Sequence, residues 1–267
     1  MKNRLIDMNN ATTYDYITEL LNKGTREDGR ENLEYRALSI KPGTMPNAEG
    51  SAEVNLGFTR VLAGVKVVLG EPMQDRPNEG NLAMSAELLP LAAAHFEPGP
   101  PSPEAIELAR VVDRGIRAAN IVDLPKLFIT EEKVWDVYVD LYVLNYDGNL
   151  FDACTMAATT ALKSARMPKY ENDAVIREGS LGKLPTKGLL SSCTFGSVAG
   201  HIILDTNANE ESFADARLTI ANDETVVRAM QKGLGGGFTP KEVSDMLDIT
   251  FEKSKEIRNA INKSIGE

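Results

Sequence analysis

Strict alternation of side-chain character in the segment VWDVYVDLYVLN restricts the fold more than any other feature of the sequence. Apolar side chains occupy every second position, namely Val137, Val139, Leu141 and Val143. Because successive side chains of a β-strand point to opposite faces, the alternation predicts a strand with one buried face and one wetter face. The turn NYDGN and the small-residue segment FDACTMAATTALKSA follow. We expect that segment to form a helix that packs closely on a neighbour, since its alanines allow near approach.

The first part of the chain mixes helix and strand signals. Residues 9–23 have a helical spacing of apolar side chains and end at Gly24. Strand signals begin at Leu38, and GSAEVNLGFTRVLAGVKVVLGEP predicts two strands joined near Gly57. The segment NEGNLAMSAELLPLAA continues as strand material, although its later part is ambiguous.

The second part begins after a polar, turn-rich segment, MPKYENDAVIREGSLGKLPTKG. Strands are expected at 190–195, 198–204 and 216–220, with a further strand in TVVRAMQKG. The last helix begins with a capping box formed by Thr239 and Glu242. Strands and helices therefore occur in mixed order in two unequal halves, which favours an α+β fold.

Composition excludes several classes of protein. The 267 residues include 39 acidic and 29 basic ones, and the net charge of −10 argues against a surface that binds nucleic acid all over. A polyanion would have to bind at a local basic patch. No apolar run reaches the ~18–20 residues of a membrane span, and the N-terminus has no secretory signal. We therefore expect a cytoplasmic protein.

Cysteines, histidines and glycines supply no clear metal or cofactor motif. Cys154, Cys193, His95 and His201 lack the close spacing of zinc ligands. We expect both cysteines to be buried, reduced thiols, although a single disulfide is also possible. The run GLGGG before the last helix could cradle a phosphate on backbone N–H groups, but a tight turn is the simpler interpretation.

Two carboxylates, Asp205 and Glu211, follow the predicted strand HIIL. Carboxylates just past the end of a strand can act as acid and base or can hold a metal ion. The intervening sequence, which contains NEE, is also typical of a solvated acidic loop. Composition alone leaves both interpretations open.

A helix is expected from Pro103 to about residue 120, with Ser102 as its N-cap. Three basic side chains share one of its faces, at spacings i, i+4 and i+7: Arg110, Arg114 and Arg117. Arginines arranged in one stripe can receive phosphate groups. The alternative is a solvated charged face, because Glu107 and Asp113 stand at salt-bridge spacings within the stripe.

Five ordered segments together resemble the RNase PH superfamily. They are REDGR, GSAEVNLGFTRVLAGVKVVLGEP, NEGNLAMSAELLPLAAAHFEPGPPSPEAIELARVVDRGIR, VWDVYVDLYVLNYDGNLFDACTMAATTAL and MQKGLGGGFTPKEV. Within the superfamily they are most similar to the non-catalytic RNase PH-type subunit of the archaeal exosome. The resemblance runs from about Arg26 through the last helix.

The resemblance implies an α+β fold of two RNase PH-type domains, with mixed sheets and packed helices. We expect an N-terminal helical extension at 1–27, a first domain at 28–185 and a second at 186–267. It also implies assembly with a catalytic RNase PH-type subunit, three such pairs closing a hexameric ring that carries RNA-binding cap subunits. The ring would shorten single-stranded RNA from its 3′ end with inorganic phosphate. No cofactor and no metal ion are expected.

The resemblance also bears on the two carboxylates. Catalytic relatives have Asp at both positions, so Asp205 is kept, but Glu211 places its carboxylate about one carbon–carbon bond further out. Where catalytic relatives have a phosphate-binding Thr-Arg after the Asp-Gly turn, this chain has Leu150 and Phe151 beyond Asn149. An arginine pair of the relatives is replaced at 101–104. We therefore expect no catalytic residue; the alternative is a phosphorolytic 3′-to-5′ exoribonuclease that uses Asp205.

The arginine stripe gains a role from the same comparison. In the non-catalytic subunits, basic residues of this helix face the partner's active site and hold the RNA backbone. Arg110 and Arg114 match that pattern, and Arg117 is included because it lies on the same face. The expected role is to position phosphates and not to recognise bases.

Overall fold

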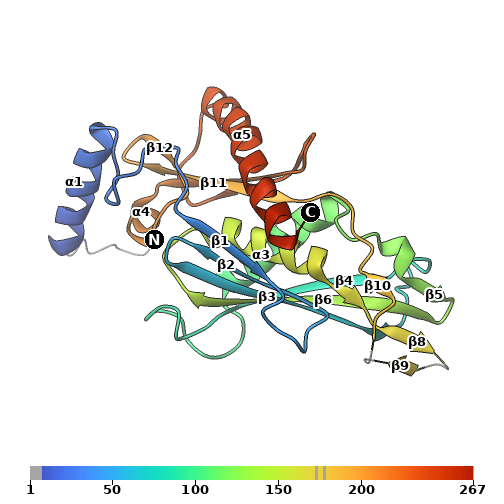
Figure 1. Ribbon diagram of the computed structural model, residues 1–267. Coiled ribbons are helices and arrows are strands. Elements are labelled where there is room, and N and C mark those ends of the chain that lie inside the picture. Colours follow the sequence, from blue (N-terminus) through green and yellow to red (C-terminus); the bar gives the residue numbers. More distant parts are fainter. Residues whose placement is uncertain (1–7, 172–173, 177–178, 267) are drawn as a thin grey trace.

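The alternating segment lies inside the larger of the two main β-sheets. The computed structural model describes residues 8–171, 174–176 and 179–266, and the segment falls in β6 (Lys133–Asn145) (Figure 1). Its four apolar side chains are each at most 1% exposed, whereas Tyr138 on the other face is 42% exposed. The predicted strand with one buried face is therefore confirmed.

The larger sheet is mixed, because β6 pairs antiparallel with β3 and parallel with β4. The strands that accompany β6 are β1 (Leu38–Pro42), β2 (Gly50–Leu56), β3 (Thr59–Gly70), β4 (Asn81–Leu88) and β5 (Phe128–Thr130). The order is β1-β2-β3-β6-β4, with β5 paired to the end of β6. As predicted, β2 and β3 join near Gly57, whose φ of 57° suits glycine.

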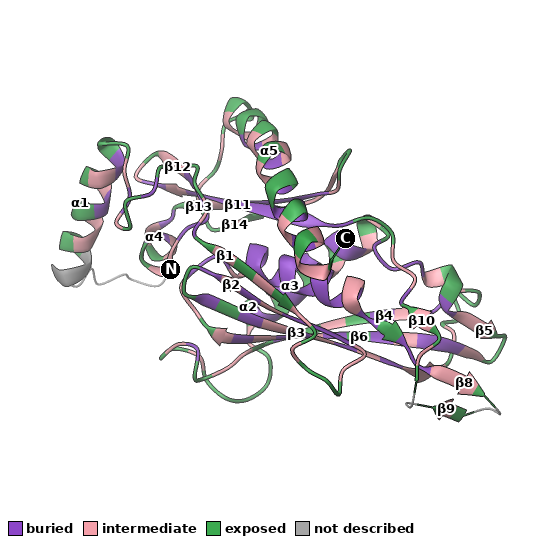
Figure 2. Ribbon diagram, in the orientation of Figure 1, coloured by how far each residue is buried: buried purple, intermediate pink, exposed green. Residues whose placement is uncertain are grey.

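The small-residue helix α3 (Leu150–Ser164) packs between the two sheets. Every residue from Phe151 to Leu162 is buried (Figure 2), and the helix contacts β2 and β3 on one side and the second sheet on the other. A Cβ atom on Gly50 of β2 would lie only 2.4 Å from the carbonyl oxygen of Ala161. The predicted close approach of this helix is therefore confirmed.

The second sheet is antiparallel, with the order β12-β11-β13-β14. Its strands are β11 (Ser191–Val198), β12 (His201–Leu204), β13 (Ala216–Asn222) and β14 (Val227–Gly233). The expected break between residues 195 and 198 is wrong, because β11 is continuous and the turn falls at Ala199 and Gly200, both with positive φ. Gly196 does not mark a turn; its missing Cβ makes room for the Thr206 side chain.

The helices around the sheets are α1 (Met8–Asn22), α2 (Pro103–Ala118), α4 (Ala208–Phe213) and α5 (Pro240–Ile265). The predicted caps form: Ser102 accepts from the Ala105 N–H, and Thr239 forms its capping box with Glu242. Helix α1 packs Ile17 and Leu21 into a small apolar cluster with β12 and with residues around the end of α4. The short helix α4 was not expected, since its sequence, ANEESF, has too few apolar residues for a helical period.

A connecting segment joins the two halves and forms short paired strands. They are β7 (Arg166–Met167), β8 (Lys169–Glu171), β9 (Ala174–Ile176) and β10 (Gly182–Lys183). Earlier in the chain, the 3₁₀ helix η1 (Leu124–Leu127) lies between α2 and β5. One buried apolar cluster extends from Ala52 in the larger sheet to Ile261 in α5. The two halves therefore share a core, and the division at 27/28 and 185/186 stays a prediction. Residues 1–7 lie outside the described part of the chain.

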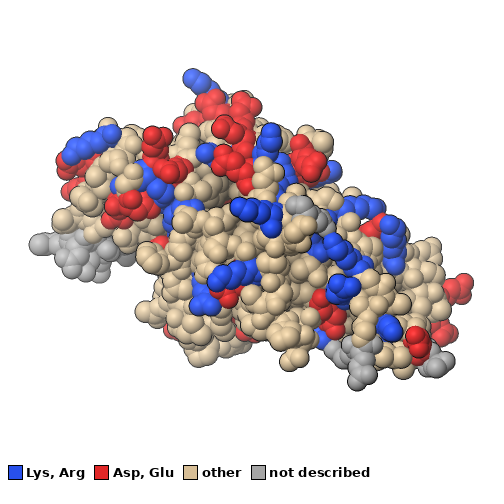
Figure 3. Space-filling view, viewed as in Figure 1, with Lys and Arg blue, Asp and Glu red and all other residues tan. Residues whose placement is uncertain are grey.

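The remaining expectations concern the thiols and the surface. Cys154 and Cys193 are fully buried and form no disulfide, as expected, and burial raises the pKa of Cys193 to about 12. Figure 3 shows lysines and arginines interspersed with acidic side chains on the visible face. Among the described residues, no helix is both long enough and apolar enough to span a membrane.

The turn between β13 and β14 generates a prediction about acid stability. Burial raises the pKa of Asp223, but N–H groups of Thr225 and Val226 and the Arg228 guanidinium outweigh it and lower the pKa to about 2. The carboxylate therefore stabilises the fold above pH ~4, and this contribution is lost as the pH falls towards 2. Asp223→Asn should lower the free energy of unfolding by about 2 kcal/mol at pH 7 and by progressively less below pH 4. Urea unfolding of both proteins across this pH range tests it; a constant difference would contradict the assignment.

Candidate functional site

Asp205 is fully buried at the end of β12, in a left-handed backbone conformation with φ of 56°. Its Oδ1 accepts hydrogen bonds from Arg36 Nη2 at 2.8 Å and Asn149 Nδ2 at 2.7 Å. Its Oδ2 accepts from the backbone N–H and Nε of Arg36, both at 2.9 Å, and from Arg30 Nη1 at 3.2 Å. These five donors occupy the lone pairs of the carboxylate. We call Asp205, Arg30, Arg36 and Asn149 the Asp205 node.

Asn149 links the Asp205 node to a second buried carboxylate, Asp152. Its side-chain Nδ2 donates to Asp205 Oδ1 and, at 2.9 Å, to Asp152 Oδ2. The other donors to Asp152 are Tyr35 Oη, Ser192 Oγ, and the N–H and Oγ1 of Thr194. Burial raises the pKa of Asp152 to about 6, although all these donors favour its ionised form. Asn149 adopts the left-handed N-cap conformation of α3 that this bridge needs.

Glu210 is a further buried carboxylate, and it lies in the acidic segment 205–211. It is 1% exposed, accepts from Arg26 Nε at 2.8 Å, and accepts the backbone N–H of Asn207 in the capping box of α4. Arg26 also donates to the carbonyl oxygens of Leu204 and Asp205, both at 2.7 Å. The solvated-loop interpretation therefore fails for Asp205 and Glu210, which are interior groups with cationic partners.

Glu211 and Phe151 occupy the rest of this region. Glu211 is half-buried and accepts the backbone N–H of Asn149 at 2.8 Å. Burial raises its pKa, against the effect of that N–H group. The Phe151 ring is buried beneath the guanidinium of Arg217, whose carbon lies 4.2 Å from the ring centroid. An apolar ring thus stands at the position where the resemblance placed a phosphate-binding side chain.

The predicted arginine stripe lies along one side of an open hollow of about 1120 Å³ between α2 and β14. The structure brings Arg110, Arg114 and Arg117 to its wall, as the helical spacing predicted. Apolar side chains on the opposite face of α2, including Leu108, Val112 and Ile116, are buried. The arginines therefore stand on a rigid element, and their contact with RNA stays a prediction.

The three arginines have different surroundings. Arg110 is exposed and has no ion-pair or hydrogen-bond partner among the described residues. Arg114 is exposed, and its Nη2 donates to Gln231 Oε1 at 2.9 Å and to the Met230 carbonyl at 3.2 Å. Arg117 is half-buried; its Nε donates to Asp113 at 2.8 Å and its Nη2 to the carbonyl of Leu82 in β4.

The alternative of local salt bridges is half right. The pair of Arg117 with Asp113 forms across one helical turn. Glu107, however, does not pair with Arg110 and instead binds Arg217 of β13 at 2.8 Å. Charge neutralisation within α2 therefore covers one end of the stripe and leaves Arg110 available to a ligand.

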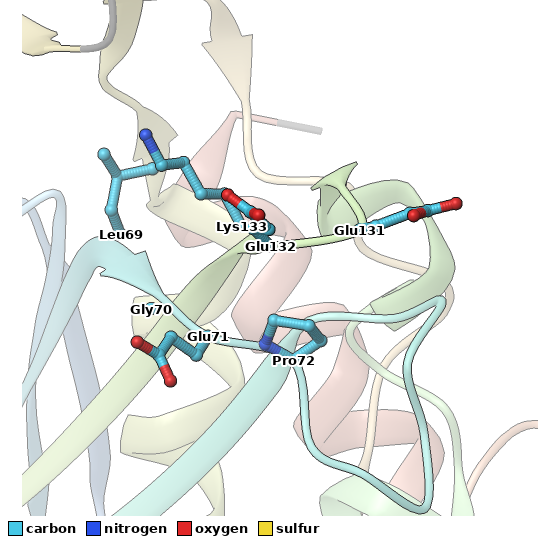
Figure 4. A pocket seen from close by; sticks show the side chains of 7 residues that line it. All are labelled: Leu69, Gly70, Glu71, Pro72, Glu131, Glu132 and Lys133. Carbon is cyan, nitrogen blue, oxygen red and sulfur yellow. The ribbon is translucent and has the colours of Figure 1, made fainter.

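Other concave or charged regions are weaker candidates for a phosphate-rich ligand. A hollow of about 590 Å³ lies between the end of β3 and the β5–β6 turn, lined by Leu69, Gly70, Glu71, Pro72, Glu131, Glu132 and Lys133 (Figure 4). In Figure 4 the Glu131 side chain extends away from the other lining residues. Three carboxylates against one ammonium group disfavour a polyanion. In the described part of the chain, no three His, Cys, Asp or Glu side chains are placed to hold a metal ion.

Sequence reasoning missed the cations that enclose the acidic segment. Arg26 and Arg30 stand in the charged turn TREDGRENLEYR, and Arg36 ends it. That density of arginines before an apolar strand was an available signal, because buried charges are normally paired. Their partners could not be named from sequence, since Asp205 lies 169 residues after Arg36. In the GLGGG run, the Gly236 N–H donates to the carbonyl oxygen of Asp215 at 2.7 Å, which ties this run to the residue before β13.

Comparison with known proteins gives consistent matches. The family described as "3' exoribonuclease family" matches through its domain 1 model at residues 34–168 and its domain 2 model at residues 188–253. The exosome complex component Rrp42 of Thermococcus gammatolerans is 46% identical over 258 residues, which cover 94% of this chain and 94% of that protein.

Two solved structures share the fold over nearly their full length. One is described as the Archaeoglobus fulgidus exosome with RNA bound to the active site; it has a TM-score of 0.89 and 41% identity, and covers 95% of this chain and 99% of its own. The other, described as an archaeal exosome core, has a TM-score of 0.86 and 38% identity, and covers 96% and 98%. The expected α+β fold of two RNase PH-type domains is therefore confirmed.

The enclosed geometry of Asp205 generates a prediction about stability. In Asp205→Asn, the amide nitrogen would face donors of Arg30 or Arg36, and these two arginines would lose the buried charge that they share, keeping only Asp28 and Asp147 as ion-pair partners. The free energy of unfolding should fall by roughly 3 kcal/mol, which urea unfolding of the chain can measure. Asparagine tolerates the left-handed backbone at this position, so strain adds little. An unchanged unfolding midpoint would show that the node is not structural.

Proposed function

This chain belongs to the 3′ exoribonuclease family of RNase PH-type proteins, and we propose that it is a non-catalytic subunit of an exosome ring that degrades RNA from the 3′ end. In this role it structures the active site of a catalytic RNase PH-type partner and helps to bind RNA. The full-length similarity to the exosome component Rrp42 supports this assignment.

The observation that carries the proposal is the saturation of Asp205. A carboxylate that assists the leaving oxygen in phosphorolysis needs a free lone pair or a proton to give, and access to substrate. Asp205 has neither, because it is 0% exposed and accepts five hydrogen bonds. The attacking phosphate would need positive or N–H donors. Here the Arg217 guanidinium lies over Phe151 and is ion-paired with Glu107, and the Asn149 N–H donates to Glu211.

Binding of single-stranded RNA is assigned to the arginine stripe on α2. Arg110 and Arg114 offer exposed guanidinium groups on one wall of the hollow, which suits contact with successive phosphates. Arg117 belongs to the same stripe, but its bonds to Asp113 and to the Leu82 carbonyl restrict it. We expect Arg117 to contribute less RNA affinity than the other two.

The assembly that we propose contains three pairs of this chain with its catalytic partner, closed into a hexameric ring in the cytoplasm, with RNA-binding cap subunits on one face. The chain would contribute a helical extension at 1–27 and RNase PH-type domains at 28–185 and 186–267. The larger sheet lies within residues 38–145 and the second within 191–233, which supports this division. Helix α1 packs on the chain's own β12 and α4, so it need not contact another subunit.

The second candidate function is a phosphorolytic exoribonuclease that uses Asp205 itself. It is favoured only by the presence of Asp205 and Glu211 after β12. Because both carboxylates serve internal hydrogen bonds, we rank it second.

Phosphate-dependent shortening of single-stranded RNA distinguishes the two functions. We expect the chain alone to release no nucleoside diphosphate, and the chain mixed with its catalytic partner to exceed the partner alone. Reactions without phosphate control for contaminating hydrolytic nucleases. Phosphate-dependent release of nucleoside diphosphates by the chain alone would support the exoribonuclease instead.

Charge reversal tests the arginine stripe. In the assembled ring, Arg110→Glu combined with Arg114→Glu should raise the KM for RNA at least tenfold, because two phosphate contacts become repulsive. The matched control is Lys241→Glu with Lys255→Glu on exposed positions of α5, which changes the net charge equally. Ring assembly, checked by light scattering, should persist in both variants.

The salt dependence of binding gives an independent measure of the same contacts. Replacing Arg110 and Arg114 by Ala should reduce the slope of log affinity against log salt by about 0.7 for each lost phosphate contact. The Lys241 and Lys255 control, changed to Ala, should keep the slope of the unmodified ring. Equal slopes for all three rings would exclude the stripe as an RNA contact.

A further inference from the structure

Arg114 is held in place by the second half of the chain. Its Nη2 donates to the side-chain oxygen of Gln231 at 2.9 Å and to the carbonyl of Met230 at 3.2 Å, both on β14. The hydrogen-bonded residues are 116 and 117 positions apart in the sequence, so the contact depends on the packing of α2 against the second sheet. Arg110, one turn earlier on the same face, has no such partner among the described residues.

Gln231, which accepts from Arg114, is itself held by Glu107 and, through Glu107, by Arg217. Gln231 Nε2 lies 3.5 Å from Glu107 Oε1, the same oxygen that accepts from Arg217 Nη2 at 2.8 Å. The guanidinium of Arg217 lies over the ring of Phe151 at the start of α3. Because Glu107 accepts from the Gln231 amide nitrogen, it fixes the orientation in which the amide oxygen faces Arg114.

This arrangement leaves some N–H donors of the Arg114 guanidinium without a protein partner in the described part of the chain. A guanidinium has five N–H donors, and the contacts with Gln231 and Met230 use only those on Nη2. Nε and Nη1 keep three N–H donors, which can each contact a phosphate oxygen. A long side chain that is already ordered loses less conformational entropy when its ligand binds. Gln231 is neutral, so it orders the Arg114 side chain and leaves its positive charge intact. A carboxylate at the same place would neutralise that charge.

We propose that Gln231 is a positioning residue for Arg114, oriented by Glu107 and Arg217, and that it raises the affinity of the assembled ring for single-stranded RNA. The inference rests on the proposed contact of Arg114 with RNA phosphate. It assigns a use to Phe151 as well: the ring that stands in place of a phosphate donor carries Arg217, which in turn holds Glu107.

The test is a double-mutant cycle in the ring assembled with its catalytic partner. Gln231→Met keeps the length and volume of the side chain but removes both hydrogen bonds. We expect the KM for single-stranded RNA to rise about fivefold, as for one lost hydrogen bond, with kcat at saturating RNA unchanged. In the Arg114→Ala background the same change should have no further effect. Gln74→Met, in the exposed loop between β3 and β4, is the chemically matched control and should leave KM unchanged.

Each other outcome counts against the inference. If Arg114→Ala raises KM but Gln231→Met does not, Gln231 is not a positioning residue and the proposed RNA contact stands. If Gln231→Met raises KM equally in both backgrounds, it acts independently of Arg114, and the inference is overturned. If Arg114→Ala leaves KM unchanged, both the RNA contact of Arg114 and its positioning by Gln231 are wrong. A fall in kcat together with a lower unfolding midpoint for Gln231→Met would indicate a general structural role and would also overturn the inference.

Discussion

The carboxylate of Asp205 is the constraint on which the rest of the structure depends. Removing a charge from water costs several kcal/mol, and an interior carboxylate is tolerated only when cations and donors surround it. Here those donors come from Arg30 and Arg36 before the first sheet and from Asn149 at the start of α3, while Asp205 itself ends a strand of the second sheet. Three distant parts of the chain must therefore meet at one point. We infer that this costly group supplies conformational specificity, because it brings those three parts together in one arrangement.

The node also fixes the elements that carry the proposed function. Asn149 caps α3 and links Asp205 to Asp152, so the helix between the sheets has one position along its axis. Helix α2 packs against α3 and β14, and its outer face presents the arginines. Interior carboxylates thus position the helices, and the surface arginines on α2 are the groups that we propose to bind RNA. The net charge of −10 is compatible with the proposed RNA binding because the arginines to which we assign it are confined to one helix.

Local patterns predicted the secondary structure well where periodicity and capping agreed. β6, α2 and α5 were placed from alternation, Ser102, and the Thr239 capping box, since these signals depend on residues at most four positions apart. The errors fell where a residue serves a distant neighbour. Gly196 resembles a turn residue but makes room for Thr206, and the segment after Asp205 resembles a loop because its cations lie far away in the sequence.

The sequence by itself determined the α+β class, the order of most elements, the shared face of Arg110, Arg114 and Arg117, and the RNase PH-type family. Each of these follows from short-range spacing or from the order of long segments. Only the tertiary structure decided that Asp205 and Glu210 are enclosed, that Glu107 pairs with Arg217, and that Arg114 rests on Gln231. The physical reason is that burial and ion pairing depend on which groups fold together. A carboxylate has the same letter in the sequence whether it meets water, a substrate or an arginine from a distant part of the chain.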